Sequence, residues 1–259
     1  MKHKPTRSIQ LIVPPLVVAG LLLSAWQLTV WVLHVKPYLL PGPTSVLAAM
    51  GRGWWELLIA ALLTARCAVV GFLICLVAGT TLGLLFAHFP FLRRGLYPYA
   101  VFFQTVPIIA VAPLVINWLG PGFTSIVAVV VIVGLFPVMA AVVEGVLSVD
   151  YSLRELFRVC QADRWQVLWK LELPAVIPFL VTGARTSSGL CVIGAIVGEF
   201  FAGHSTRAHG LGYIIPQRIQ WLKTDEAFAA VFVAVGLGLL MFMAVSAARN
   251  GPLRRYCRS

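Results

Sequence analysis

The 259-residue sequence has few charged residues, and acidic residues are the scarcest. Charged residues make up 11% of the chain, with 9 Asp and Glu against 20 Lys and Arg, while 60% of the residues are hydrophobic. Soluble domains have about 25% charged and about 45–50% apolar residues. The composition therefore excludes an ordinary soluble globular protein and predicts an all-α integral membrane protein of several spans.

Patterns typical of catalysis and metal binding are also lacking. No Gly-Lys-Ser or Gly-Lys-Thr is present, which excludes a phosphate-binding P-loop in this chain. No His-Glu-x-x-His pattern occurs, and the 5 cysteines are scattered without a Cys-x-x-Cys pair. We therefore expect no cofactor, no metal and no enzymatic site of its own.

Six apolar runs are present, each long enough to cross about 30 Å of hydrocarbon, which takes about 20 residues. Lys2, Lys4 and Arg7 precede the first run, as in a secretory signal peptide. That run is long for a signal core and no small-x-small cleavage site closes it, so we predict a retained helix. The six predicted spans are 9–33, 65–88, 98–118, 123–147, 174–202 and 226–248.

The basic residues are distributed unequally between the loops. With the N-terminus inside, the cytoplasmic pieces 1–8, 89–97, 148–173 and 249–259 contain thirteen Lys and Arg, and the outer pieces contain five. This asymmetry follows the positive-inside rule and explains the net charge better than nucleic-acid binding does. Arg66 and Arg185 are expected near span ends, where long side chains snorkel. We predict a multi-pass protein with both termini in the cytoplasm.

A polar segment at 150–174 interrupts the apolar runs. Ser152 and Glu155 have the spacing of a capping box that would begin a helix, and a second short helix is predicted near Asp163, with Trp165 on its apolar face. The segment is either a docking segment, or handle, to which a soluble partner binds, or an interfacial helix that lies on anionic lipid. Its residue pattern does not decide between these two interpretations. The apolar face of the first helix consists of Leu153, Leu156, Phe157 and Cys160.

These residues resemble a known family. Glu155-Leu156-Phe157, Gln161 and Leu171–Pro174 are similar to the EAA loop of permease subunits of bacterial binding-protein-dependent ABC importers. Leu156 and Phe157 replace two Ala of that pattern. Gln161 replaces a Gly that suits a left-handed helix end, so we expect either a different turn or two helices that run together. Further similar segments are Asn117–Gly122, Phe136-Pro137, Gly145–Asp150, Gly194–Gly203 and Gly210–Gly212.

The resemblance implies a type I importer permease (MetI-like) fold of about six helices in the bacterial inner membrane. It implies an N-terminal helix and periplasmic segment at 1–64, a permease core at 65–248 and a cytoplasmic tail at 249–259. The implied substrates are those of the nitrate, sulfonate, taurine and pyrimidine-type vitamin precursor subgroup. The implied ATPase-coupling residues are Leu153, Glu155, Leu156, Phe157, Cys160, Gln161, Asp163 and Trp165.

The same resemblance implies partners. They are cytoplasmic ABC ATPase subunits that bind ATP and Mg, a periplasmic or lipid-anchored solute-binding protein, and a second copy or paralogue of the chain. The alternative is a secondary transporter or channel that needs no ATPase. Such a protein is expected to have paired intramembrane charges or inverted halves, and the sequence has neither pattern.

Polar residues within the apolar runs are candidates for a translocation path, because a charge at mid-membrane costs at least about 2.5–3.5 kcal/mol. The candidates are Gln104, Asn117, Ser187 and Glu199. As alternatives, Glu199 could fix the outer helix ends, and Ser187 could join two helices by a hydrogen bond. Two Gly-x-x-x-Gly spacings, at 79–83 and 194–198, favour close packing inside the bundle. Pro98, Pro107 and Pro113 predict kinks or breaks in the third span.

Overall fold

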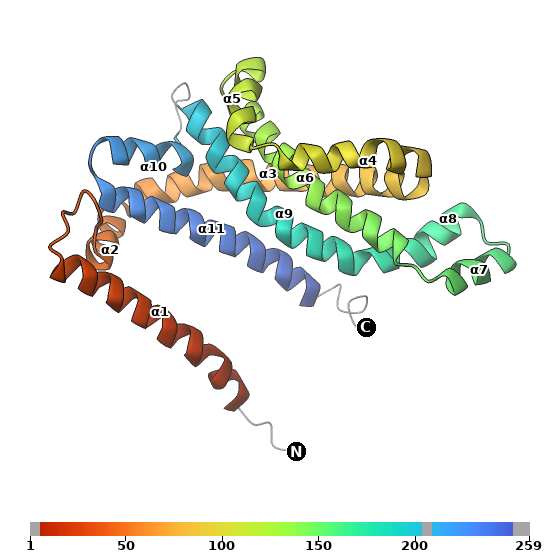
Figure 1. Ribbon diagram of the computed structural model, residues 1–259, viewed down its shortest axis with the longest axis horizontal. Helices are drawn as coiled ribbons and strands as arrows, with labels where there is room; N and C mark the ends of the chain where they lie inside the picture. Colours follow the sequence, from red (N-terminus) through yellow and green to blue (C-terminus); the bar gives the residue numbers. More distant parts are fainter. Residues whose placement is uncertain (1–5, 204–208, 251–259) are drawn as a thin grey trace. The chain divides into compact units, whose positions relative to one another are not determined.

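The computed structural model describes residues 6–203 and 209–250 (Figure 1). Within these ranges the chain forms helices and no strand, which confirms the all-α prediction. Two compact units are present. Unit 1 comprises Met1–Leu58 and Ile214–Phe232, and unit 2 comprises Ile59–Tyr213 and Val233–Ser259. The predicted boundaries at 64 and 248 stay predictions, and Lys2, Lys4 and the tail beyond Asn250 lie outside the described residues.

Among the described residues, four helical stretches are long and apolar enough to cross a membrane. They contain four of the predicted spans, at 65–88, 123–147, 174–202 and 226–248. The first predicted span, 9–33, lies almost wholly in a fifth helix, α1 (Thr6–Val32). The four stretches are α3 (Trp54–His88), α6 (Phe123–Leu147), the stretch Arg164–Ala202 that includes α9 (Leu173–Ala202), and Thr224–Ala248 of α11 (Thr224–Asn250).

The predicted continuous span 98–118 is wrong. The chain instead forms two helices, α4 (Pro90–Thr105) and α5 (Ile108–Leu119), with a break at Val106-Pro107. Pro107 caps α5 with an extended backbone, φ −61° and ψ 117°. Proline has no N–H to donate, and it disfavours helical geometry in the residue before it. The break predicted at Pro107 is therefore correct, whereas Pro98 and Pro113 lie inside α4 and α5.

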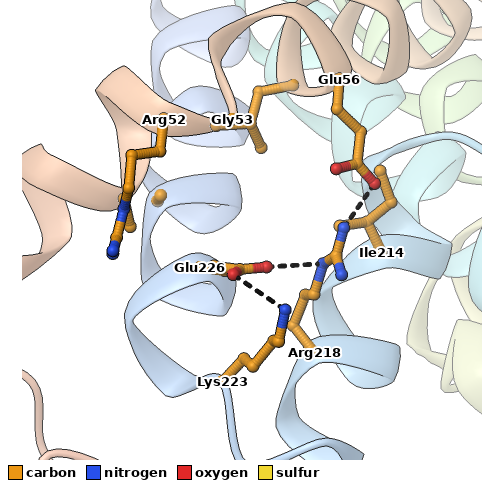
Figure 2. Close-up of a pocket in the computed structure, with 10 residues that line it drawn as sticks. Arg52, Gly53, Glu56, Ile214, Arg218, Lys223 and Glu226 are labelled. Carbon is orange, nitrogen blue, oxygen red and sulfur yellow. Dashed lines mark hydrogen bonds and ion pairs between the residues drawn. The ribbon is translucent and has the colours of Figure 1, made fainter.

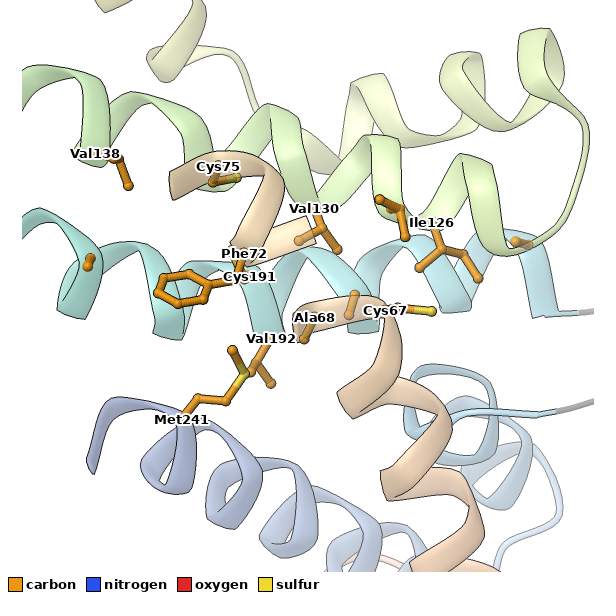
Figure 3. Packing of buried hydrophobic residues seen from close by; sticks show 14 of the residues in the cluster. Cys67, Ala68, Phe72, Cys75, Ile126, Val130, Val138, Cys191, Val192 and Met241 are labelled. Carbon is orange, nitrogen blue, oxygen red and sulfur yellow. The ribbon is translucent and has the colours of Figure 1, made fainter. Parts of the chain in front are cut away.

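The core of unit 2 is built on the pairing of α6 with α9, against which α3 packs (Figure 3). Both Gly-x-x-x-Gly motifs face α6. A Cβ on Gly83 would lie 2.6 Å from the Val142 Cβ, and one on Gly194 would lie 3.0 Å from the Val130 Cα. Glycine is needed there because no side chain fits between the backbones. The prediction that these motifs pack inside the bundle is confirmed.

Unit 1 contains α1, the short helix α2 (Pro43–Arg52), the start of α3, and parts of α10 (Leu211–Gln220) and α11. Gly42 precedes α2 and Pro43 opens it, where the missing proline N–H costs nothing. A cavity of about 310 Å³ is lined by an ion-pair group centred on Arg218 (Figure 2). Arg218 pairs with Glu56 at 2.5 Å and with Glu226 at 3.1 Å. These pairs join the start of α3 to α10 and α11.

Candidate functional site

The polar segment after α6 begins with helix α7 (Tyr151–Val159). Its N-cap is Asp150, whose Oδ1 accepts hydrogen bonds from the Ser152 N–H at 2.9 Å and from the Ser152 hydroxyl at 2.5 Å. These bonds hold the Asp150 pKa below its ordinary value. The predicted capping box of Ser152 and Glu155 is therefore wrong, because the carboxylate two residues earlier takes the capping role. Glu155 instead lies 3.5 Å from Arg158.

Most of the apolar face of α7 is exposed within the described chain. Leu153, Leu156 and Val159 are 46%, 56% and 78% exposed, and Cys160 after them is also exposed. Phe157 is half-buried. In Figure 1, α7 and α8 (Arg164–Val167) extend beyond the ends of α6 and α9. A projecting helix with exposed leucines is typical of a protein interface.

The turn between α7 and α8 keeps the geometry that a glycine would take. Gln161 has a left-handed φ of +53°. Its N–H donates to the Arg158 carbonyl at 3.0 Å, and the Ala162 N–H donates to the Phe157 carbonyl at 3.0 Å, which together form a Schellman motif. Both expectations for the substitution of this Gly are therefore wrong: the turn is not different and the helices do not run together. A non-Gly residue in this conformation costs on the order of 1 kcal/mol.

The part of the loop that follows the turn, which we call the second arm, begins where the sequence predicts. Asp163 caps α8, and its capping box with Gln166 is complete. Trp165 is exposed, and it contributes to a mainly apolar cavity of about 760 Å³ between this arm and the end of α3. After α8 the helix widens into the π-helical turn η1 (Leu168–Glu172), in which the Leu173 N–H donates to the Leu168 carbonyl. The wider turn ends two residues before Pro174, whose nitrogen cannot donate to the helix.

A buried carboxylate joins the loop to the membrane-spanning helices. Glu172 is 3% exposed, with Oε2 2.8 Å from the His88 Nε2 and Oε1 3.3 Å from the Arg154 Nη1. Arg154 also donates from Nη2 to the Val146 carbonyl at 2.6 Å. His88 ends α3, Val146 lies in the last turn of α6, and Arg154 belongs to α7. Glu172 and Arg154 together therefore connect α7 to the ends of α3 and α6 and to the turn that precedes α9.

The His88 ring fits this role. Nδ1 lies 2.9 Å from the Leu84 carbonyl oxygen and Nε2 faces Glu172, so both ring nitrogens face acceptors. Sequence reasoning missed the group, although its acid lies inside the Leu-Glu-Leu-Pro segment and His88 closes a predicted span. We call His88, Arg154 and Glu172 the loop anchor.

The four candidate path residues do not form one cluster. Gln104 and Asn117 are exposed, on α4 and α5, whereas Ser187 and Glu199 are buried on α9. Ser187 donates to the Gly134 carbonyl at 2.7 Å, joining α9 to α6. Their role in a path stays a prediction.

Glu199 joins the end of α9 to α3 and to the start of α10. Its Oε2 accepts from the Thr64 hydroxyl at 2.8 Å and from the Gly212 N–H at 2.9 Å, and the Leu211 N–H donates to Thr64 at 3.0 Å. A carboxylate at the N-terminus of α10 also satisfies otherwise unpaired backbone donors. These contacts match the alternative in which Glu199 holds helices α3, α9 and α10 together.

Comparisons with known proteins agree with this geometry. Residues 79–250 match the family model described as "Binding-protein-dependent transport system inner membrane component". The chain is 32% identical over 246 residues to the formylaminopyrimidine transport permease protein ThiX of Halalkalibacterium halodurans, covering 94% of this chain and 96% of that one. It is 36% identical over 229 residues to the riboflavin transport system permease protein RibX of Chloroflexus aurantiacus, covering 86% and 82%.

The fold is similar to that of a solved importer. A chain in the inward-facing MetNI methionine ABC transporter aligns with a TM-score of 0.65 and 21% identity, covering 79% of this chain and 98% of that one. Permeases for aliphatic sulfonates and taurine are among the more distant relatives. The chain therefore belongs to the binding-protein-dependent transport system inner membrane components, the multi-pass inner-membrane permeases of ABC importers.

Proposed function

We propose that the chain is the membrane-spanning subunit of an ATP-driven importer and that a separate ATPase drives it through α7. One arrangement supports this proposal above all: the leucines of α7 are exposed, and the loop anchor connects α7 to α3, α6 and the turn before α9. A force applied to α7 therefore reaches the long helices directly. In this proposal the chain binds no cofactor, and ATP and Mg belong to the ATPase subunits.

The remaining partners are a periplasmic or lipid-anchored solute-binding protein and a second copy or paralogue of the chain. For the solute we favour a heterocyclic vitamin or vitamin precursor, since the relatives at 32% and 36% identity are named for formylaminopyrimidine and riboflavin. The aliphatic sulfonate and taurine permeases are each 27% identical, so a sulfonate is the second candidate.

If a separate ATPase drives import, the purified chain alone should not hydrolyse ATP, because its sequence has no P-loop. Reconstitution into proteoliposomes with its ATPase and a loaded binding protein should restore hydrolysis and give ATP-dependent uptake. Uptake of riboflavin, a pyrimidine precursor and taurine is measured side by side. Uptake that continues without the ATPase would instead support the secondary-transporter alternative.

The proposed orientation places both termini and the loop 150–174 in the cytoplasm. We expect a cysteine introduced at Lys36, an exposed residue between α1 and α2, to react with an impermeant thiol reagent added outside intact cells. A cysteine at Arg94, an exposed residue of α4, should react only after the membrane is opened. Both variants are made in a chain whose native cysteines are replaced. The reverse pattern contradicts the orientation.

A further inference from the structure

Arg185 lies near the middle of α9, which belongs to a helical stretch long and apolar enough to cross a membrane. It is thirteen residues after Glu172, which contacts the last residue of α3, and fourteen before Glu199, which contacts the first turn of α10. At 1.5 Å per residue, both ends are about 20 Å away. An arginine side chain is far shorter than that, so it cannot snorkel to either surface. The expectation that Arg185 lies near a span end is therefore wrong.

The Arg185 guanidinium has no acidic partner within the described chain. It stacks over the Phe242 ring of α11, 5.7 Å from the ring centroid. Its Nε is buried without a hydrogen-bond partner, and so is the Ser246 hydroxyl one turn further along α11. Thr182 and Thr186 flank Arg185 on the uncovered face of α9, and each hydroxyl donates to its own helix. The threonine oxygens keep acceptor capacity, so the face around Arg185 is polar.

No carboxylate of this chain can reach Arg185. All 9 acidic residues lie in the described ranges. Glu144 lies one turn from the inner end of α6, and Glu199 is bonded at the outer end of α9. The remaining acids lie in the cytoplasmic loop and η1 or in the first turns of α3 and α11. A second copy related by an axis along the membrane normal has its acids at the same depths.

Lipid phosphates lie at the membrane surfaces, so they do not supply the missing acceptor either. A polar or charged group at this depth is expected to face a water-filled cavity or a pathway and not lipid. We infer that Arg185 lines the translocation path and binds acceptor oxygens of the solute, either sulfonate oxygens or ring carbonyl oxygens, as the solute crosses the membrane. This inference rests on the proposed importer function and names a specificity-determining residue for it.

The first test is solute uptake by the whole complex in proteoliposomes, with riboflavin and taurine as separate probes. Arg185→Gln should lower uptake of the imported probe about 10- to 100-fold, the value of a charged hydrogen bond. The Arg185→Gln complex should retain the ATPase and should hydrolyse ATP at the wild-type basal rate. Arg185→Lys should keep taurine uptake but not riboflavin uptake, because an ammonium binds an anion but loses the two-pronged contact to ring carbonyls.

Arg66→Gln is the matched control, since Arg66 lies at the outer part of α3 over the Phe123 ring. It should leave uptake unchanged. Wild-type uptake by Arg185→Gln overturns the inference, and so does loss of the ATPase from that variant, which would show a structural role.

The second test does not depend on uptake. Thr186→Cys, one residue from Arg185, is placed in the complex in a chain without native cysteines and treated with a charged methanethiosulfonate reagent from both sides. A water-filled path predicts rapid labelling. Val235→Cys, on an exposed apolar face of α11, should stay unlabelled. Labelling of Thr186→Cys in a complex that imports neither probe would support the path and reject the proposed substrates, whereas absence of labelling overturns the inference.

Discussion

Leu156→Asp should release the ATPase from the complex and abolish import. Leu156 is 56% exposed on α7, so the substitution leaves the fold of the loop intact. In a cleft of the partner, the new carboxylate would be buried without a counter-charge, which costs several kcal/mol. Because each 1.4 kcal/mol is a factor of ten, affinity should fall at least about 100-fold. Copurification of the ATPase with tagged permease in detergent measures the effect.

Trp169→Asp is the matched control for this substitution. Trp169 is 65% exposed but lies on the second arm, in η1. If α7 is the handle, the ATPase stays bound to Trp169→Asp and is lost from Leu156→Asp. If the loop instead lies on anionic lipid, both variants keep the ATPase, and the proposed role of α7 is rejected. Phe157 is less suitable for this test, because its side chain is half-buried and a charge there could also disturb the fold of the loop.

Local signals in the sequence predicted local structure well. The run 123–147 matches α6 residue for residue, and Asp163 caps α8 as its position before a short apolar pattern indicates. The break at Pro107 follows from the geometry of proline, yet hydropathy alone merged α4 and α5 into one span. The cap of α7 was misplaced because Asp150 and Ser152 are both good caps two residues apart, and pattern alone does not choose between them.

The functional groups that sequence reasoning missed depend on distant contacts. The loop anchor joins residues 88, 154 and 172, which lie far apart in sequence and meet only when α3, α6 and α9 end at the same level. Arg185 is a different case. It lies eleven residues inside the predicted run 174–202, so helical rise by itself places it near mid-membrane. Its lack of an acidic partner becomes evident only from the packing.

Glu172→Ala should uncouple ATP hydrolysis from import. The substitution removes the shared acceptor of His88 and Arg154 and cuts the link between α7 and the ends of α3 and η1. Because His88 and Arg154 are both partly exposed, we expect a loss of stability of only about 1–3 kcal/mol, less than for a fully buried pair. The exposed surface of α7 is unchanged, so the ATPase should still bind.

With α7 bound but its anchor removed, motion of the ATPase should reach the long helices poorly. We expect ATP hydrolysis within about threefold of wild type while import per ATP falls at least about tenfold, because the substitution removes both Glu172 contacts of the loop anchor. Glu144→Ala is the control. Glu144 is an exposed acid one turn from the end of α6 and is outside the loop anchor, so import per ATP should not change. If Glu172→Ala keeps the wild-type ratio of solute imported to ATP hydrolysed, then α7 drives the long helices through contacts other than the loop anchor.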